Sequence, residues 1–168
     1  MKKLRVGILS TGSIAATMAG TVAKMKEAEV YAVASRTKEK AEKFAVRFGA
    51  QKAYGSYEEM ADDENVDLVY VATPISEHYE NVKMLIDHGR NVLCEKAFAV
   101  NEKQAAEMTA LAEEKGVLLA EAIWVRYMPM WTTLKQILDS GAIGEPMTLT
   151  CNLCYLIDRV PRLVKPEL

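Results

Sequence analysis

Short uninterrupted apolar runs alternate with longer stretches of helical periodicity along most of this chain. The runs are residues 4–9, 30–34, 68–72, 92–94 and 117–123. They are rich in valine, leucine and isoleucine and do not alternate with polar residues, which is typical of strands buried on both faces of a sheet. Strands that alternate with helices across short loops form parallel βαβ units with right-handed crossovers. The pattern therefore predicts an α/β fold with a doubly wound parallel sheet.

The intervening stretches have the spacing and the end signals of helices. Apolar residues recur at helical intervals at Ile14, Met18 and Val22, at Phe44, Ala45 and Phe48, and at Val82, Leu85 and Ile86. Glycines suited to the left-handed residue after a helix are Gly49, Gly89, Gly116 and Gly141. Ser56 with Glu59 predicts a capping box at a helix start, and Asn101 with Gln104 predicts a looser one.

Composition and charge exclude several classes of partner. The 168 residues carry a net charge of -2, which provides no basic field for nucleic acid or for an anionic membrane surface. The apolar runs are far shorter than the roughly 18 residues of a membrane-spanning helix, so we expect no membrane segment. The three cysteines are an odd number without the spacing of a disulfide framework, so we expect a reducing, cytoplasmic location.

The first apolar run leads into residues 10–15, Ser-Thr-Gly-Ser-Ile-Ala, and a helical stretch follows directly. A glycine-rich turn between a first strand and a first helix, G-x-G-x-x-G/A, is the fingerprint of dinucleotide binding. Gly12 and Ala15 match its second and third positions, whereas Ser10 departs from the first. Because Gly12 has no side chain, the backbone there can approach a pyrophosphate bound at the helix N-terminus.

Two interpretations of this loop are open. It is either a cofactor site or a strand-to-helix turn that binds nothing, and its position in the first βαβ unit favours the cofactor. Serine at the first fingerprint position implies either an ordinary φ in that turn or some strain. The residues expected to contact the cofactor are Ser10, Thr11, Gly12, Ser13 and Ile14.

The end of the second apolar run indicates which cofactor is bound. That run continues into Ser35, Arg36 and Thr37, and Lys38 and Lys40 follow at the start of a helical stretch. Enzymes that use NAD usually carry an acidic residue there, which bonds the ribose 2′-hydroxyl. A guanidinium with two hydroxyls suits a 2′-phosphate instead. The alternative is a solvated basic helix start, but the position favours NADP over NAD, bound by Ser35, Arg36, Thr37 and Lys40.

The pattern changes after residue 123. A helix is predicted over residues 127–140, with Pro129 near its first turn. Residues 147–155 alternate between apolar and more polar side chains, which predicts a strand with one buried face. One strand cannot form a sheet by itself. We therefore expect a dinucleotide-binding Rossmann domain over 1–123 and, over 124–168, a connecting helix and the start of an incomplete α+β domain for substrate binding or dimerisation.

Segments after three of the later strands resemble those of a known family. They are residues 72–74, Ala-Thr-Pro, with His78 following; residues 94–96, Cys-Glu-Lys; and residues 121–127, Glu-Ala-Ile-Trp-Val-Arg-Tyr. Together with residues 10–15 they resemble the glucose–fructose oxidoreductase, inositol dehydrogenase and MocA (Gfo/Idh/MocA) family, and within it the NADP-using, dihydrodiol dehydrogenase-like members. The resemblance extends over essentially the whole chain, which reaches roughly the middle of a typical member.

The resemblance implies a catalytic role for Lys96. In the family, the matching lysine lies beside the nicotinamide and bonds the substrate oxygen that gains or loses a proton. Hydride transfer from an alcohol needs such a partner for the hydroxyl proton. From the residues alone, a surface lysine at a strand end is the simpler interpretation. Ala97 replaces the proline of the family's Glu-Lys-Pro motif, so we expect a trans peptide bond there, and the position of Lys96 stays open.

The resemblance places several further residues at the cofactor. Thr73 and Pro74 are expected to line the nicotinamide ribose, or else simply to start the next helix. Glu95 is expected beside them. His78 belongs to the same group, although a structural hydrogen bond is expected of it rather than catalysis.

Trp124 and Arg126 complete the predicted site. They shape the cofactor or substrate pocket, or else the aromatic side chain only seals a domain junction. Cys151 and Cys154 have the spacing of half a zinc site, but a partner pair is missing and their thiols would face opposite ways on a strand, so we expect no metal. Residues 62–64, Asp-Asp-Glu, are interpreted as a solvated loop.

Three functional hypotheses follow. The first is an NADP-dependent oxidoreductase that transfers a hydride between nicotinamide and a small-molecule substrate, a sugar or a cyclic diol, of which this chain is the cofactor-binding half. The second is a non-catalytic NADP(H)-binding module or truncated inactive relative. The third is a fragment that needs a partner chain to fold. A lone strand at 147–155 would expose an apolar face and unpaired edges, so we also expect a homo-oligomer.

Overall fold

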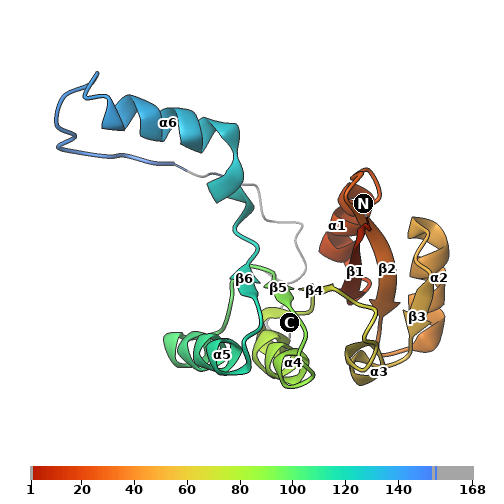
Figure 1. Cartoon of the computed structure of the whole chain (residues 1–168). Coiled ribbons are helices and arrows are strands. Elements are labelled where there is room, and N and C mark those ends of the chain that lie inside the picture. Colours follow the sequence, from red (N-terminus) through yellow and green to blue (C-terminus); the bar gives the residue numbers. More distant parts are fainter. Residues whose placement is uncertain (1, 153, 155–168) are drawn as a thin grey trace. The chain divides into compact units, whose positions relative to one another are not determined.

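The structure is a computed structural model that describes residues 2–152 and 154, and it divides into two compact units between Trp124 and Val125 (Figure 1). The strands of the first unit are β1 (Leu4–Leu9), β2 (Ala28–Ala34), β3 (Lys52–Tyr54), β4 (Leu68–Val71), β5 (Val92–Cys94) and β6 (Leu119–Glu121). The helices between them are α1 (Ser13–Val22), α2 (Lys38–Phe48), α3 (Tyr57–Ala61), α4 (Ile75–Asp87) and α5 (Glu102–Lys115).

The six strands form one parallel sheet in the order β3-β2-β1-β4-β5-β6. The chain builds outward from β1 to β2 and β3, and then returns to the other side of β1 with β4, β5 and β6. The strand order therefore reverses between β1 and β4, as in a doubly wound Rossmann-type sheet. The predicted fold class of this unit is confirmed.

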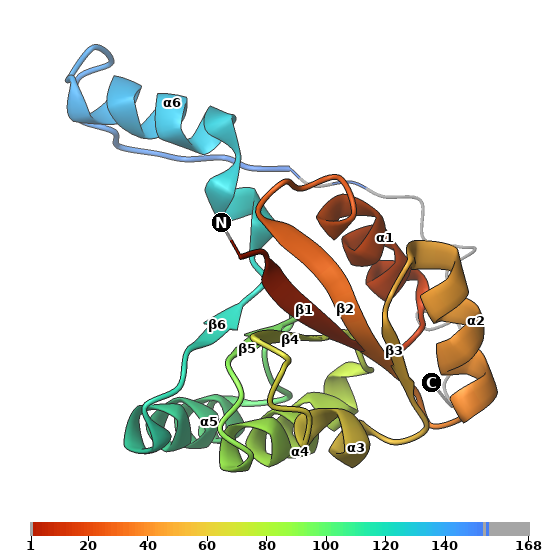
Figure 2. The ribbon, with the colours of Figure 1, turned by 45° about the vertical axis from the view of Figure 1, so that its right-hand side comes forward.

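Helices cover both faces of the sheet, with α1 and α2 on one face and α3, α4 and α5 on the other (Figure 2). Neighbouring residues of a strand point to opposite faces, so that Ile8 packs under α1 and α2 whereas Leu9 packs on the other side. In the same way Tyr70 of β4 belongs to the first core, and Val69 and Val71 to the second. This two-sided burial explains why the strand sequences are apolar without alternation.

The predicted helix ends are confirmed. Ser56 Oγ accepts a hydrogen bond from Glu59 N (3.1 Å), and Asn101 Oδ1 accepts one from Gln104 N (3.0 Å). In both caps the returning side chain bonds a backbone N–H one residue before the capping residue, at Gly55 and Val100. The glycines with positive φ include the four that were predicted, Gly49, Gly89, Gly116 and Gly141.

Strand β3 lies outside the apolar runs from which the strands were predicted. It has three residues, none of them fully buried, and it pairs only with β2 at the edge of the sheet. An edge strand of this length needs no continuous apolar run, because much of its surface remains in water. The pattern of buried strands therefore gave no signal for it.

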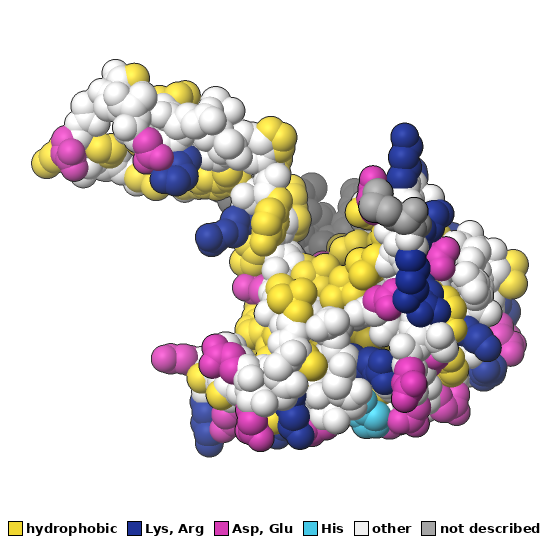
Figure 3. Space-filling view, in the orientation of Figure 1, with side chains coloured by type: hydrophobic (Ala, Val, Ile, Leu, Met, Phe, Trp, Pro, Cys, Tyr) yellow, Lys and Arg dark blue, Asp and Glu magenta, His cyan; other side chains and the backbone are white. Residues whose placement is uncertain are grey.

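The second unit begins within a 3-10 turn (Trp124–Tyr127) and continues into helix α6 (Pro129–Asp139), which starts at the predicted Pro129. Figure 3 shows hydrophobic side chains at the surface of α6. They include Met130, Trp131, Leu134, Ile137 and Leu138. No helix among the described residues is long and apolar enough to cross a membrane.

The strand predicted over residues 147–155 is not found in the described part of that segment. Residues 147–152 and 154 belong to no strand, and Leu153 and Tyr155 lie outside the described residues. Alternation indicates only that one face could be buried, whereas a strand forms when a second strand accepts its hydrogen bonds. Within residues 2–152 no such partner pairs with this segment. Met147 and Leu149 accordingly remain almost fully exposed, at 89% each.

Candidate cofactor site

The predicted site residues of the first unit lie in the loops that leave the carboxyl ends of neighbouring strands or near the start of the helices that follow these loops. Parallel sheets bind ligands at that edge, beside the point where the strand order reverses. Backbone hydrogen bonds continue the sheet beyond the strands and hold the loop starts together: Ser10 N donates to Ala34 O (2.9 Å), Ala72 N to Leu9 O (3.1 Å), Glu95 N to Val71 O (3.0 Å) and Ala122 N to Cys94 O (2.7 Å). The fold thus gathers one edge from segments far apart in sequence.

The loop after β1 turns sharply at Ser10. Its φ of 104° lies in a region that residues with side chains rarely adopt, so the expectation of an ordinary φ is wrong and the strained alternative holds. Ser10 Oγ accepts a hydrogen bond from Gly12 N (3.3 Å), which closes the turn. The fingerprint has glycine at the first position because glycine adopts such a φ without steric cost.

Gly12 stands at the N-cap of α1 with an ordinary φ of -72°. A β-carbon at this position would have Ser10 Oγ, 3.7 Å away, as its nearest contact, so the fold itself leaves the space in front of Gly12 open. No side chain among the described residues caps α1, and its first turn contains no acidic residue. The unpaired N–H groups and the positive end of the helix dipole therefore face a space that an anion can enter.

The segment after β2 exposes its basic side chains unequally. Lys38 is engaged, because its Nζ donates to Ala53 O (2.5 Å) and lies 5.9 Å from the centre of the Tyr54 ring. Arg36 and Lys40 are exposed, and neither forms an ion pair within the described residues. Thr37 precedes α2 without capping it through its side chain. Arg36, Thr37 and Lys40 are thus the groups that remain available to a ligand.

His78 and Thr73 are buried just behind the loop after β4. His78 is 1% exposed, and its two ring nitrogens lie 3.0 Å from Thr73 O and 3.0 Å from Ala97 O. Thr73 Oγ1 accepts a hydrogen bond from Asn81 Nδ2 (3.0 Å). These contacts hold the loop in place, while Pro74 is exposed at the start of α4.

Glu95 is a buried carboxylate at the end of β5, only 8% exposed. Its Oε1 accepts a hydrogen bond from the hydroxyl of Tyr70, and its Oε2 accepts one from Lys96 N (3.1 Å). Burial raises the pKa of Tyr70, and the bond to Glu95 raises it further, so the phenol stays a proton donor. Lys96 has an exposed side chain beside this pair, and its backbone is fixed by the carboxylate.

The peptide bond between Lys96 and Ala97 is cis, so the expected trans bond is wrong. The backbone beyond this bond is held from two directions. His78 contacts Ala97 O, as described, and Phe98 N donates to Glu121 Oε1 (3.0 Å). Side chains of α4 and β6 thus contact this loop, and the identity of residue 97 alone does not reveal these contacts.

Cys94 contributes no nucleophile to the site. Burial raises the pKa of its thiol to about 12, and the charges of Glu121 and Glu95 add to the effect, so the thiol stays protonated at neutral pH. Cys151 and Cys154 are exposed in the second unit. Within the described residues no group of three or more His, Cys, Asp or Glu side chains gathers as metal ligands would.

Asp63 departs from the solvated loop that was predicted for residues 62–64. Its Oδ2 accepts a hydrogen bond from Tyr54 OH (2.7 Å), and its Oδ1 accepts bonds from Asn65 N and Asn65 Nδ2, both at 2.9 Å. Burial alone would raise the pKa of Asp63, but these hydrogen bonds outweigh it and lower the pKa to about 2. Asp63 therefore ties α3 to β3 instead of facing only water.

Trp124 and Arg126 lie on either side of the unit boundary. Trp124 ends the first unit shortly after β6, with 61% of its surface exposed. Within the second unit, Arg126 lines a hollow of about 300 Å³ together with Trp131, Thr132 and Lys135. A place for Arg126 in the cofactor site therefore stays a prediction.

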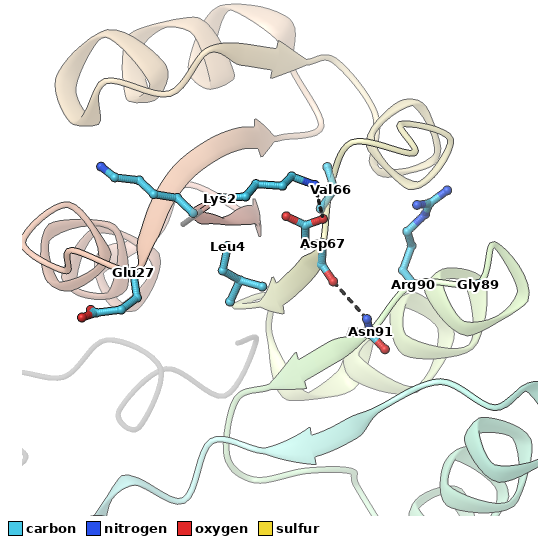
Figure 4. A pocket seen from close by; sticks show the side chains of 9 residues that line it. Lys2, Leu4, Glu27, Val66, Asp67, Gly89, Arg90 and Asn91 are labelled. Carbon is cyan, nitrogen blue, oxygen red and sulfur yellow. Dashed lines mark hydrogen bonds and ion pairs between the residues drawn. The ribbon is translucent and has the colours of Figure 1, made fainter.

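A second hollow, of about 540 Å³, lies at the opposite, amino edge of the sheet (Figure 4). Its lining includes Leu4 at the start of β1, Glu27 just before β2 and Asn91 just before β5. Asp67 in this lining already has partners, because Lys2 Nζ lies 3.6 Å from Asp67 Oδ1 and the backbone N–H of Arg5 donates to Asp67 Oδ2 (2.8 Å). Parallel sheets bind ligands at the other edge, so this hollow is not the cofactor site.

A doubly wound parallel sheet whose first helix opens on a glycine at the switch point defines a Rossmann-type nucleotide-binding domain. The family model described as "Oxidoreductase family, NAD-binding Rossmann fold" matches residues 4–123. The chain belongs to this family, Gfo/Idh/MocA, and the resemblance found in the sequence is confirmed.

The curated relatives include two different dehydrogenases. The trans-1,2-dihydrobenzene-1,2-diol dehydrogenase of Mus musculus is 40% identical over 161 residues, which are 95% of this chain and 48% of that protein. The D-xylose 1-dehydrogenase (NADP(+)) of Hypocrea jecorina is 40% identical over 153 residues, which are 84% of this chain and 39% of that protein. The chain spans about half the length of the curated relatives it matches.

Solved structures of similar fold include a 3-ketoreductase from Actinomadura kijaniata in complex with TDP-benzene and NADP. It is 32% identical with a TM-score of 0.79, and the match covers 86% of this chain and 46% of that one. The scyllo-inositol dehydrogenase of Lactobacillus casei has a TM-score of 0.78 at 18% identity, over 86% of this chain and 43% of that one. The second likeness shows the fold alone.

Proposed function

We propose that this chain is the NADP-binding part of an oxidoreductase that transfers a hydride between nicotinamide and a sugar or a cyclic diol. Membership of the oxidoreductase family supports the reaction class. The names of the relatives, a dihydrodiol dehydrogenase and an NADP-dependent xylose dehydrogenase, support the two substrate classes. The observation that carries the cofactor assignment is the exposed Arg36 at the end of β2, where NAD-binding domains usually have a carboxylate.

The residues present fit a dinucleotide phosphate. The open space before Gly12 and the uncapped N-terminus of α1 suit the pyrophosphate, which helix N–H groups bind. Arg36, Thr37 and Lys40 suit the 2′-phosphate, because a guanidinium forms paired, charge-assisted hydrogen bonds with phosphate oxygens. Ser35 N is bonded to Tyr54 O (3.2 Å), which orients the segment that presents these groups. When bound, the cofactor would accept the hydride in alcohol oxidation and supply it in the reverse reduction.

We assign to Lys96 the role of exchanging a proton with the substrate oxygen. Its ammonium is exposed at the carboxyl edge, and Glu95 holds its backbone N–H. A primary amine at that place can hold or donate a proton at the oxygen while the hydride moves at the neighbouring carbon. Thr73 and Pro74 form the adjoining wall on the side of β4.

A second candidate is binding of NADP(H) without turnover by this chain. The observation in its favour is the exposure of Lys96, because the described residues of the first unit leave its ammonium open to water. Self-association also stays a prediction, and the exposed apolar side chains along α6 now give it a structural basis in place of the predicted strand.

Titration with NADPH and NADH, followed by turnover with a panel of sugars and cyclic diols, tests the proposal. We expect tighter binding of NADPH. Equal binding of both cofactors would remove the assignment of NADP. NADP-dependent turnover that Lys96→Ala abolishes would favour the enzyme over the binding module.

A further inference from the structure

Glu95 is a buried carboxylate that lacks a cationic partner among the described residues. Both of its hydrogen-bond donors, the Tyr70 hydroxyl and the Lys96 backbone N–H, are uncharged groups. No lysine, arginine or histidine nitrogen within residues 2–152 lies at ion-pair distance from it. Burying a charge is costly unless it is paired, and the two hydrogen bonds offset that cost only in part. The carboxylate is therefore available to a cation that comes from outside the described chain.

The position of this charge is set by the core. Tyr70 is 1% exposed and packs in the core cluster under α1 and α2, so its hydroxyl has little freedom. The Tyr70 hydroxyl, on β4, donates to Glu95 Oε1, and Lys96 N, in the loop after β5, donates to Glu95 Oε2. Two points of attachment on different segments fix the carboxylate at the carboxyl edge of the sheet, where the cofactor loop after β1 also lies.

We infer that Glu95, positioned by Tyr70, makes the site prefer the oxidised cofactor over the reduced one. This rests on the proposed function. The nicotinamide ring of NADP+ carries a positive charge, whereas the ring of NADPH carries none. A carboxylate fixed in a poorly solvated site attracts the charged ring and leaves the neutral ring unaffected. The resulting difference in affinity favours oxidation of the alcohol, with Tyr70 acting only through Glu95.

A purely structural role for the same pair predicts something different. If Glu95 serves only to hold Lys96 N, replacing it weakens the binding of NADP+ and NADPH alike. The ratio of the two dissociation constants therefore separates the two roles, since a general loss of structure cancels in the ratio. 2′-Phospho-ADP-ribose supplies a matched control, because it contains the phosphates and the adenosine but no nicotinamide.

The experiment measures dissociation constants of NADP+, NADPH and 2′-phospho-ADP-ribose for wild type, Glu95→Gln and Tyr70→Phe. We expect Glu95→Gln to weaken the binding of NADP+ about three- to tenfold relative to the binding of NADPH, because one charge–charge attraction is lost. Tyr70→Phe should change the ratio in the same direction by a smaller factor. Both variants should still bind 2′-phospho-ADP-ribose, which shows that they are folded, and any change in this binding measures the loss of contacts outside the nicotinamide ring.

The outcomes distinguish this inference from the proposed function. Wild type that binds none of the three ligands overturns the proposed function and the inference with it. The inference alone is overturned if wild type binds all three ligands and both variants keep the wild-type ratio of the dissociation constants of NADP+ and NADPH. If Glu95→Gln no longer binds 2′-phospho-ADP-ribose, the test depends on the ratio of the NADP+ and NADPH dissociation constants in Tyr70→Phe. Weaker binding of NADP+ relative to NADPH supports the inference, and an unchanged ratio overturns it.

Discussion

His78 Nδ1 lies 3.0 Å from the backbone oxygen of Ala97, nineteen residues further along the chain. The other ring nitrogen of His78 lies 3.0 Å from Thr73 O. One buried imidazole thus joins the loop after β4 to the loop after β5, which carries Lys96. The two loops that flank the proposed nicotinamide site are thus held together by a side chain that is itself 1% exposed.

Replacing His78 with alanine should therefore destabilise the first unit. Loss of the ring removes a contact from the buried Thr73 O and from the part-buried Ala97 O and leaves a cavity where the 1%-exposed ring was, which we expect to cost about 2 to 4 kcal/mol of unfolding free energy. His88→Ala is the matched control, because His88 is exposed and its ion pair with Asp62 (3.4 Å) should contribute about 1 kcal/mol or less. Chemical denaturation measures both, and equal losses would contradict the bridging role of His78.

Asp63 should make the stability of this protein sensitive to acid. The pKa of Asp63 is lowered to about 2 in the fold, against an ordinary value of 3.8. A lowered folded pKa stabilises the fold above the unfolded pKa, and this contribution disappears as the pH falls from about 4 toward 2. Because Asp63 is partly exposed, we expect a loss of about 1 to 2 kcal/mol over that range.

Asp63→Asn should lower the stability at neutral pH and flatten its decline between pH 4 and pH 2. Asp62→Asn is the neighbouring control, since Asp62 is largely exposed and its ion pair with His88 should contribute about 1 kcal/mol or less. Unfolding free energies measured across this pH range test both statements. An Asp63→Asn variant that declines as steeply as wild type would show that Asp63 is not the responsible group.

Gly12→Val should abolish NADPH binding while the fold persists. The valine side chain would project into the open space before α1, and its β-carbon would meet only Ser10 Oγ, 3.7 Å away. The φ of -72° at this position is accessible to valine, so no backbone strain is introduced. Thermal unfolding should stay near the wild-type value. A valine variant that binds NADPH as wild type does would reduce the loop to a simple turn.

The 168-residue chain by itself should show negligible turnover with sugars and diols, even when saturated with NADP. Positioning of the substrate beside the nicotinamide supplies much of the rate in such reactions. Lys96 is exposed, so the described residues of the first unit do not enclose the place where a substrate would meet it. Steady production of NADPH that disappears in Lys96→Ala would contradict this expectation.

Much of the fold could be predicted because burial on both faces leaves a direct mark on the sequence. β1 and β5 have the predicted bounds, and Ser56 and Asn101 cap helices as their spacing indicated. β3 left no such mark, since an edge strand of three residues needs no apolar run. Over residues 147–155 a strand was predicted but is not found in the described residues, because an alternating pattern does not supply a pairing partner.

The site could be predicted only as far as topology reaches. Parallel strands place their following loops at one edge, so the loops that begin near residues 10, 35, 73 and 95 lie together once the strand order is known. The groups that set their geometry were missed, because Tyr70, Asn81 and Glu121 act across 25, 8 and 23 residues of sequence. Tyr70 did leave one signal, a hydroxyl within an otherwise apolar strand, which must find a partner when buried.

The central claim is that Arg36 selects NADP, and its test compares Arg36→Ala with Lys38→Ala. The two residues lie close in sequence, but Lys38 is bonded to Ala53 O whereas Arg36 is exposed and forms no ion pair within the described residues. The measurement is the ratio of the dissociation constants of NADH and NADPH. We expect a preference for NADPH in wild type and in Lys38→Ala, and its loss by roughly ten- to a hundredfold in Arg36→Ala. Equal binding of the two cofactors by wild type, or an unchanged preference in Arg36→Ala, would contradict the account.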